Sequence, residues 1–164
     1  MKTLVLMRHA KSAWANPQLT DSERPLNKRG LKNAPAMGKL IRNMGLSPQY
    51  VLCSTSLRTR QTAEAVLRKC QFNGEIKYLE SLYLGAPQAY LDALHKVPDP
   101  IDKVLVVGHN TGMEEFLEFL TGRFEKLPTA AVVHLILHID RWEQLNATSG
   151  TRVIDIWKPR KIAQ

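Results

Sequence analysis

The run Lys103-Val104-Leu105-Val106-Val107 constrains the fold more than any other feature, because four consecutive apolar residues end abruptly at Gly108. Residues 3–7 form a second compact apolar run. Apolar runs without alternation are typical of strands that are buried on both faces of a sheet. Such strands need other elements packed over both faces, so we expect helices between them.

Residues 28–44 have the spacing of a helix. Their apolar positions recur every three or four residues and predict core contacts for Leu31, Met37, Leu40, Ile41 and Met44. Pro35 lies inside this pattern and predicts a kink or a late start of the helix. Gly45 is a typical residue for a helix end.

Three more segments predict helices. Residues 57–70 have apolar residues at helical spacing, and Pro87 is placed to open a further helix. Residues 112–121 follow a capping signature, because Thr111 stands three residues before Glu114. Helices therefore alternate with the apolar runs along the chain.

Further strands are predicted at 50–53, 76–79, 131–139 and 152–157. Strands that alternate with helices predict an α/β protein, here a three-layer α/β/α sandwich with a mainly parallel sheet. The length of 164 residues fits one domain, so we assign residues 1–164 to a single domain.

The composition is that of an ordinary globular protein, with 44% hydrophobic and 23% charged residues. Cys53 and Cys70 form no CxxC and no cluster with histidine at metal-ligand spacing, which favours reduced cysteines in a cytosolic protein. The apolar run at the N-terminus is too short for a signal peptide, and no stretch approaches the roughly 20 apolar residues of a membrane span. We therefore expect a cytoplasmic protein without a membrane segment.

The net charge is +8, from 23 basic and 15 acidic residues. A basic protein attracts anions such as phosphorylated substrates, nucleic acid or acidic lipid surfaces. The basic residues are spread along the chain apart from a short cluster at 158–161, and no strand combines aromatic and basic residues as an RNA-binding platform would. A phosphorylated substrate is therefore favoured over nucleic acid as the partner.

Three short segments are expected to meet at one rim of the sheet, because ligands of such proteins bind beyond the carboxyl ends of the strands. They are Arg8-His9-Ala10 after the first strand, Ser54 to Arg58 after the second, and Gly108-His109-Asn110 after the fourth. Each has a purely structural alternative, as a strand end or a turn. Their combination, each directly after a strand, favours a shared site.

The residue types at this rim suit a phosphoryl group. The planar guanidinium of arginine grips phosphate oxygens through two parallel hydrogen bonds, and histidine acts as nucleophile, base or charged donor near neutral pH. The three segments lack the carboxylates or cysteines of a metal site, and the chain has no GxSxG, P-loop or GxGxxG motif. We therefore expect no metal and no cofactor.

These motifs resemble a known family. Leu6-Met7-Arg8-His9-Ala10-Lys11-Ser12 resembles the signature of the histidine phosphatase superfamily, which contains phosphoglycerate mutases and acid phosphatases, and 54–63 and 107–110 resemble its second and third motifs. The short chain and the stretch 21–30, with Arg24-Pro25-Leu26-Asn27 inside it, resemble the SixA-type phosphohistidine phosphatases. The similarity covers the chain up to about residue 157 and implies a phosphoglycerate mutase-like fold.

The resemblance implies catalytic roles for four residues. His9 would attack phosphorus and carry a transient phosphohistidine, while Arg8, Arg58 and His109 would surround the transferred group. Two arginines and a protonated histidine would neutralise its charge without a metal ion, and a bond to one ring nitrogen of His9 should fix its tautomer. Further candidates for substrate contacts are Ser12, Arg24 and Asn110. For Arg24 a role in bracing its loop is an equal alternative.

The general acid is the open point. An alcohol leaving group needs a proton, and in many relatives a glutamate after the third strand supplies it. Glu80 occupies the comparable place, with an ordinary exposed glutamate as the alternative reading, and where other relatives have an aspartate this chain has Asn110. A phosphohistidine substrate would relax the need for an acid, because its P–N bond is labile. His95, His134 and His138 lie outside the motifs and are interpreted as structural or surface residues.

We therefore expect a phosphatase that hydrolyses phosphohistidine on a protein, or a small phosphomonoester, through a covalent intermediate on His9. The pocket should also bind phosphate-like anions such as sulfate. The alternatives are a metabolite or sugar-phosphate phosphatase or mutase of the same superfamily, and a non-catalytic phosphoprotein-binding module. Neither the physiological substrate nor the oligomeric state follows from the sequence.

Overall fold

A computed structural model describes residues 1–159 of the chain. Its strands are β1 (Lys2–Arg8), β2 (Tyr50–Ser54), β3 (Ile76–Leu79), β4 (Lys103–Gly108), β5 (Val132–Leu137) and β6 (Arg152–Trp157). Its α-helices are α1 (Lys28–Asn43), α2 (Leu57–Cys70), α3 (Pro87–His95) and α4 (Gly112–Thr121). Short 3₁₀ turns include η1 (Asp21–Glu23) and η2 (Glu80–Leu82). All the predicted strands and helices are therefore present within a few residues of the expected bounds.

The strands form one sheet in the order β3-β2-β4-β1-β5-β6. The first four are parallel to one another, whereas β5 and β6 each pair antiparallel with their neighbour. The central strands are buried on both faces, as the apolar runs predicted, and residues 4–7 of β1 have no exposed surface. The prediction of a mainly parallel sheet is confirmed.

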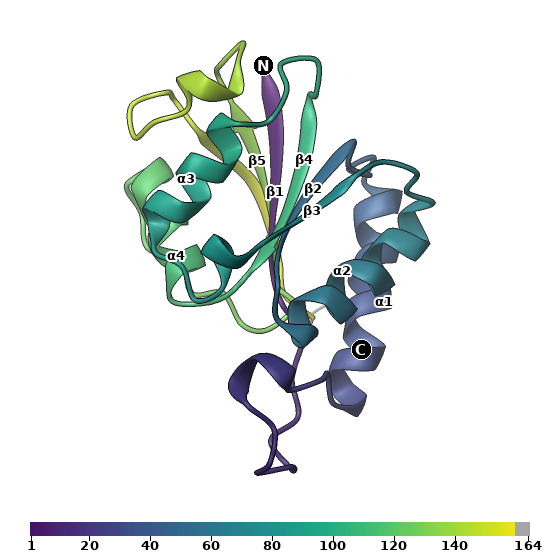
Figure 1. Cartoon of the computed structure of the whole chain (residues 1–164). Coiled ribbons are helices and arrows are strands. Elements are labelled where there is room, and N and C mark those ends of the chain that lie inside the picture. The colour runs from purple at the N-terminus through teal and green to yellow at the C-terminus, as the bar shows by residue number, and fades with distance from the viewer. Residues whose placement is uncertain (160–164) are drawn as a thin grey trace.

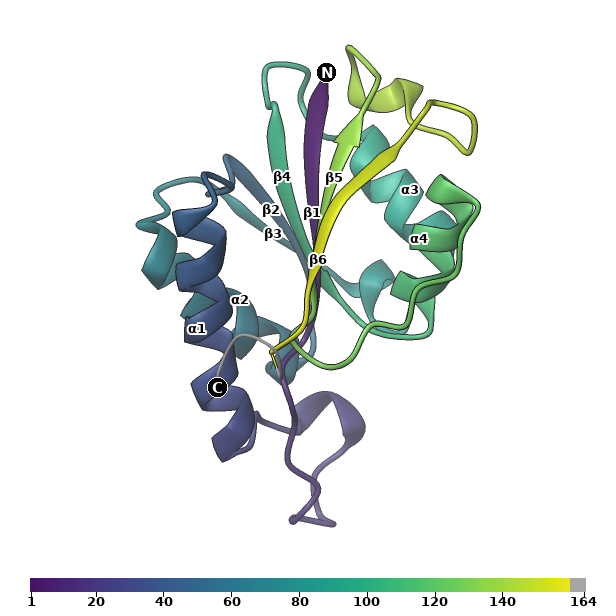
Figure 2. The same cartoon turned by 180° about the vertical axis from the view of Figure 1, so that it is seen from behind.

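Two helical layers cover this sheet (Figures 1 and 2). Helices α1 and α2 lie on one face and α3 and α4 on the other, so that each face carries its own hydrophobic core. The chain leaves β1 toward β2 through α1 and leaves β4 toward β5 through α4, on opposite faces. The carboxyl ends of the adjacent β1 and β4 therefore border the crevice at which sheets of this class bind ligands.

Parts of the helix predictions were wrong. Leu31 and Met44 are 57% and 51% exposed, whereas the buried stripe of α1 runs through small residues such as Ala34 and Gly38. The small residues are needed because α1 packs closely on α2: a Cβ on Gly38 would lie 2.7 Å from the Cα of Val66. Met37 and Ile41 are buried and Leu40 packs against the same core, as predicted, so large apolar residues identified part of the contact face.

The start of α1 and the cap of α4 also differ from expectation. Helix α1 begins at Lys28 rather than late, because the Asn27 side chain accepts a hydrogen bond from the Gly30 amide, and the helix continues through Pro35. The predicted capping box of α4 does not form, since the Thr111 hydroxyl donates to the Glu115 carboxylate instead.

Among residues 1–159, no helix has the length and apolar character that crossing a bilayer requires. Of the predicted basic cluster 158–161, Lys158 is described, while Arg160 and Lys161 lie outside the described residues. The single-domain assignment stays a prediction.

Candidate active site

The three predicted segments meet at one end of the sheet, at the carboxyl ends of β1, β2 and β4 (Figure 1). The long segment between β1 and α1, which contains η1, extends beyond the sheet at this end. A cavity of about 250 Å³ lies there, and seven of the predicted site residues are among those that line it: Arg8, His9, Ser12, Arg24, Arg58, His109 and Asn110.

His9 is held as a neutral ring. Its Nδ1 lies 2.7 Å from the Ala10 carbonyl oxygen, which can only accept, so Nδ1 carries the proton and Nε2 carries a lone pair. The side chain is 7% exposed, and burial together with the neighbouring cations lowers the pKa of His9 to about 3. This backbone carbonyl is the tautomer-fixing partner that the sequence could not identify.

His109 faces His9 across the cavity, with the two ring centroids 5.3 Å apart. Arg58 Nη2 donates toward His109 Nδ1 at 3.4 Å, so the ring proton lies on Nε2 and is donated to Ser54 Oγ at 2.8 Å. Burial and the Arg58 charge lower the pKa of His109 to about 4. These protein groups alone therefore favour neutral His109 and not the predicted protonated form. A phosphoryl dianion beside the ring would raise the pKa of His109.

The backbone of His109 is fixed by Tyr90 from α3. The Tyr90 hydroxyl accepts a hydrogen bond from the His109 amide at 3.1 Å and donates one to the His109 carbonyl at 3.3 Å. Gly108 allows this approach, because a Cβ there would lie 2.4 Å from the Tyr90 oxygen. The helical spacing of α3 indicates only that Tyr90 faces the core, and nothing in it indicates this polar contact.

The two arginines keep unused hydrogen-bond donors beside this histidine pair. Arg8 donates from Nη1 to the Leu127 carbonyl at 3.0 Å, and Arg58 donates from Nη1 to the Asp21 carbonyl at 2.8 Å. The Nε atoms of both arginines are buried and have no partner within residues 1–159. Buried donors are nearly always paired in proteins, so the donor set fits an anion in the cavity.

Asp21 was not predicted as a site residue, although it lies in the stretch that carries the family resemblance. Its carboxylate bonds Arg58 Nη2 at 2.9 Å, Arg24 Nη2 at 3.0 Å and the Tyr83 hydroxyl. Partial burial opposes its ionisation, but these hydrogen bonds outweigh that effect and hold the pKa of Asp21 below its usual range. A lone carboxylate in a loop has no periodic signal, so only the fold reveals this brace.

Arg24 and Ser12 belong to the same network of hydrogen bonds around Asp21. Arg24 Nη1 donates to Ser12 Oγ at 2.9 Å, its Nε donates to Asp21, and its guanidinium lies 3.5 Å from the ring centroid of Trp14. Both residues line the cavity, and the contacts of Arg24 are those of a loop brace. Whether Arg24 also contacts substrate stays a prediction.

Asn110 and Glu80 have different surroundings. Asn110 lines the cavity, where its Nδ2 donates to the Leu127 carbonyl at 2.7 Å and its buried Oδ1 has no partner within the described residues. Glu80 is exposed, accepts a hydrogen bond from Thr55 Oγ1 at 2.6 Å, and is not among the described residues that line the cavity. Among the described residues that line the cavity, the carboxylate is that of Asp21.

The remaining histidines and cysteines lie apart from this cavity. His95 Nε2 bonds the Leu145 carbonyl, and His134 stacks on Trp157, in keeping with structural roles. Cys53 and Cys70 are free thiols, and burial raises the pKa of Cys53 to about 12. Within residues 1–159 no group of three or more His, Cys, Asp or Glu side chains could hold a metal ion.

Comparisons with known proteins agree with this geometry. The profile of the family described as Histidine phosphatase superfamily (branch 1) matches residues 4–83. An uncharacterised chloroplastic protein of Arabidopsis thaliana is 32% identical over 161 residues, which cover 91% of this chain and 72% of that protein.

Two solved structures are similar over nearly the whole chain. A candidate phosphohistidine phosphatase SixA from Agrobacterium tumefaciens is 29% identical, with a TM-score of 0.83 over 96% of this chain and 98% of its own. A second candidate SixA, from Nakamurella multipartitia, is 28% identical, with a TM-score of 0.86 over 96% of both chains. The predicted phosphoglycerate mutase-like α/β sandwich is confirmed by these similarities.

Proposed function

Because this chain belongs to the histidine phosphatase superfamily, we propose that it hydrolyses phosphohistidine on a protein through a covalent phosphohistidine intermediate on His9. The observation that carries the proposal is the bond from His9 Nδ1 to the Ala10 carbonyl. It leaves Nε2 as an unprotonated nucleophile in a cavity lined by Arg8, Arg58 and His109.

The cationic groups bind the phosphoryl oxygens. The guanidinium groups of Arg8 and Arg58, which line the cavity, supply hydrogen-bond donors and charge. In phosphoryl transfer, catalysis consists mainly of positioning and of stabilising charge on the equatorial oxygens. His109 adds a third donor when the approaching dianion raises its pKa.

The reaction has two displacement steps. In the first, His9 Nε2 bonds to phosphorus while the substrate P–N bond breaks, and its electron pair goes to the leaving imidazole nitrogen. A proton already on the other nitrogen of that ring makes the leaving group a neutral imidazole. In the second, water attacks phosphorus, the bond to Nε2 breaks, the attacking water loses a proton to solvent, and orthophosphate leaves.

The protonation state of the residues that line the cavity favours an imidazole over an alcohol as the leaving group. An alkoxide needs a general acid, which contributes typically 10²–10⁴-fold in rate. Asp21 lines the cavity, but its pKa is lowered by Tyr83, Arg58 and Arg24, so it stays ionised and cannot donate a proton at neutral pH. An imidazole leaving group needs no such acid.

A small phosphomonoester is the alternative substrate, and Glu80 is then the proposed acid, as the resemblance implies. Its exposed position against Thr55 lies outside the cavity lining, so we expect Glu80→Gln to keep the wild-type rates on phosphohistidine and on an aryl phosphate. Loss of ester hydrolysis alone would instead assign Glu80 as the acid for a metabolite phosphatase.

The direct test is His9→Ala. We expect the rates on phosphohistidine protein and on para-nitrophenyl phosphate to fall by more than about 10³-fold, since removal of a nucleophile costs at least this much. Wild type should also retain a phosphoryl group on His9 after rapid quenching in alkali, where phosphohistidine survives. Undiminished turnover by the variant would refute the proposal, and stoichiometric phosphate binding without turnover by wild type would favour a binding module.

The cellular location belongs to the same proposal. We expect the cytoplasm, where the free thiols of Cys53 and Cys70 stay reduced. Fractionation of cells that produce the full-length protein tests this expectation, and recovery from another compartment would contradict it.

A further inference from the structure

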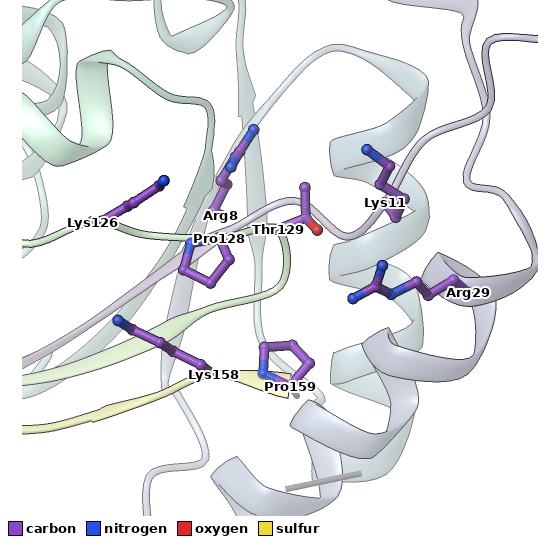
Figure 3. Close-up of a pocket in the computed structure, with 8 residues that line it drawn as sticks. All are labelled: Arg8, Lys11, Arg29, Lys126, Pro128, Thr129, Lys158 and Pro159. Atoms are coloured by element: carbon purple, nitrogen blue, oxygen red, sulfur yellow. The ribbon is translucent and has the colours of Figure 1, made fainter. Parts of the chain in front are cut away.

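A second cavity, of about 500 Å³, lies beside the proposed catalytic cavity and is strongly basic. Five cationic residues are among those that line it: Arg8, Lys11, Arg29, Lys126 and Lys158. Figure 3 shows Lys126 and Arg29 extending toward the cavity from opposite sides, with Arg8 between them.

This basic cavity adjoins the proposed catalytic one. Arg8, Lys11 and Thr129 line both cavities. Because Arg8 lines both cavities, one molecule can place a phosphoryl group at His9 and a second group in the basic cavity beside Arg8. The basic cavity is therefore placed to contact the part of a substrate that is not transferred.

The positive charges are not balanced within the described residues. No acidic residue is among the residues that line the cavity, and none of Lys11, Arg29, Lys126 and Lys158 forms an ion pair within residues 1–159. Burial lowers the pKa of Arg8, and the charge of Glu114 opposes this effect. The Oε2 atom of Glu114 accepts a hydrogen bond from the Leu127 amide. Clustered cations without counterions raise the potential and attract anions.

The cluster exists only in the folded chain. Arg8 ends β1, Arg29 lies in the first turn of α1, Lys126 precedes β5 and Lys158 follows β6, so the four come from distant parts of the sequence. They gather because the carboxyl ends of β1 and β6 lie at the same end of the sheet, beside the start of α1 (Figure 2).

We propose that this basic cavity is a second anion-binding subsite, which takes a carboxylate group of the substrate adjacent to the phosphoryl group that is hydrolysed. The proposal rests on the proposed function and deepens it, because it defines the substrate as an anion beyond its transferred group. The second anion is supplied either by acidic side chains that flank a phosphohistidine or by a carboxylate of a small phosphorylated molecule.

The test compares substrates that differ in the second anion. One pair is a phosphohistidine peptide flanked by glutamates and the same peptide flanked by glutamines. The other pair is 3-phosphoglycerate, which has a carboxylate, and glycerol 3-phosphate, which has none. For each pair the measured quantity is the ratio of the two kcat/KM values, which cancels any general loss of activity.

The enzymes compared are wild type, the triple variant Arg29→Gln, Lys126→Gln, Lys158→Gln, and Lys39→Gln as a matched control. Lys39 is an exposed lysine of α1, roughly 15 Å along the helix from Arg29 at 1.5 Å rise per residue. An exposed ion pair contributes roughly twofold to fivefold in binding, so three lost cations should change the ratio by about tenfold to a hundredfold.

We expect a ratio of about ten or more for at least one pair in wild type and in the control, which falls toward one in the triple variant and in high salt. The pair that responds identifies the source of the second anion. Ratios near one for both pairs in wild type, or ratios that the triple variant keeps, would overturn the proposal. Failure of the proposed function is a separate result, since it shows as turnover that survives in His9→Ala.

Discussion

Acidification from pH 7 to pH 5 should destabilise the folded protein, because it contains two buried neutral histidines near positively charged arginines. His9 is 7% exposed and His109 is 1% exposed. Burial, followed by nearby charges, lowers their pKa values to about 3 and about 4 from the ordinary 6.5. Between these values the unfolded chain binds protons that the folded protein does not, so stability is complete above pH 6.5 and falls as the pH drops toward 4.

The size of the effect follows from this linkage. With an unfolded pKa of 6.5, each histidine should lose about 2 kcal/mol of stability between pH 7 and pH 5, or about 4 kcal/mol for both. This is a large part of the roughly 5–15 kcal/mol that stabilises a typical domain. Burial also lowers the pKa of His134, which therefore adds to the loss of stability on acidification. Asp21 contributes stability that is lost only as the pH falls below about 4, outside this window.

The assay is urea unfolding at the two pH values, followed by tryptophan fluorescence, in buffers without phosphate or sulfate, because anions that bind the folded state would mask the difference. His9→Gln and His109→Gln should each reduce the loss to about 2 kcal/mol, with an unchanged dependence on urea. Equal stability of wild type at pH 7 and pH 5, or the full loss in both variants, would refute the reasoning.

Two further predictions concern residues around the site. Asp21→Asn keeps the side-chain shape but removes the charge that holds Arg58 and Arg24, so kcat/KM for phosphohistidine peptide should fall about tenfold, and a wild-type value would show that the brace is only structural. Gly108→Ala places a Cβ 2.4 Å from the Tyr90 hydroxyl and should destabilise the fold by about 1–3 kcal/mol in thermal unfolding, whereas an unchanged midpoint would mean that Tyr90 moves freely.

Much of the fold could be predicted because its signals are local. The run at 103–107 and the one at 3–7 are both central strands with no more than traces of exposed surface in their apolar residues. The exposed Leu31 could not be predicted, because the contact face of α1 depends on how closely α2 approaches. Periodicity shows that a helix has a buried face, but the neighbouring helix decides which residues fill it.

The amino-acid sequence by itself determined the alternation of strands and helices and the positions of Arg8, His9, Arg58 and His109 after strand ends, because each is encoded over a few neighbouring residues. Tertiary structure alone decided which groups surround them. The bond that fixes the His9 tautomer, the Asp21 brace on Arg58 and the basic cavity around Arg8 all depend on the path of the backbone. Contacts between residues far apart in sequence have no local spacing, so only the folded chain defines them.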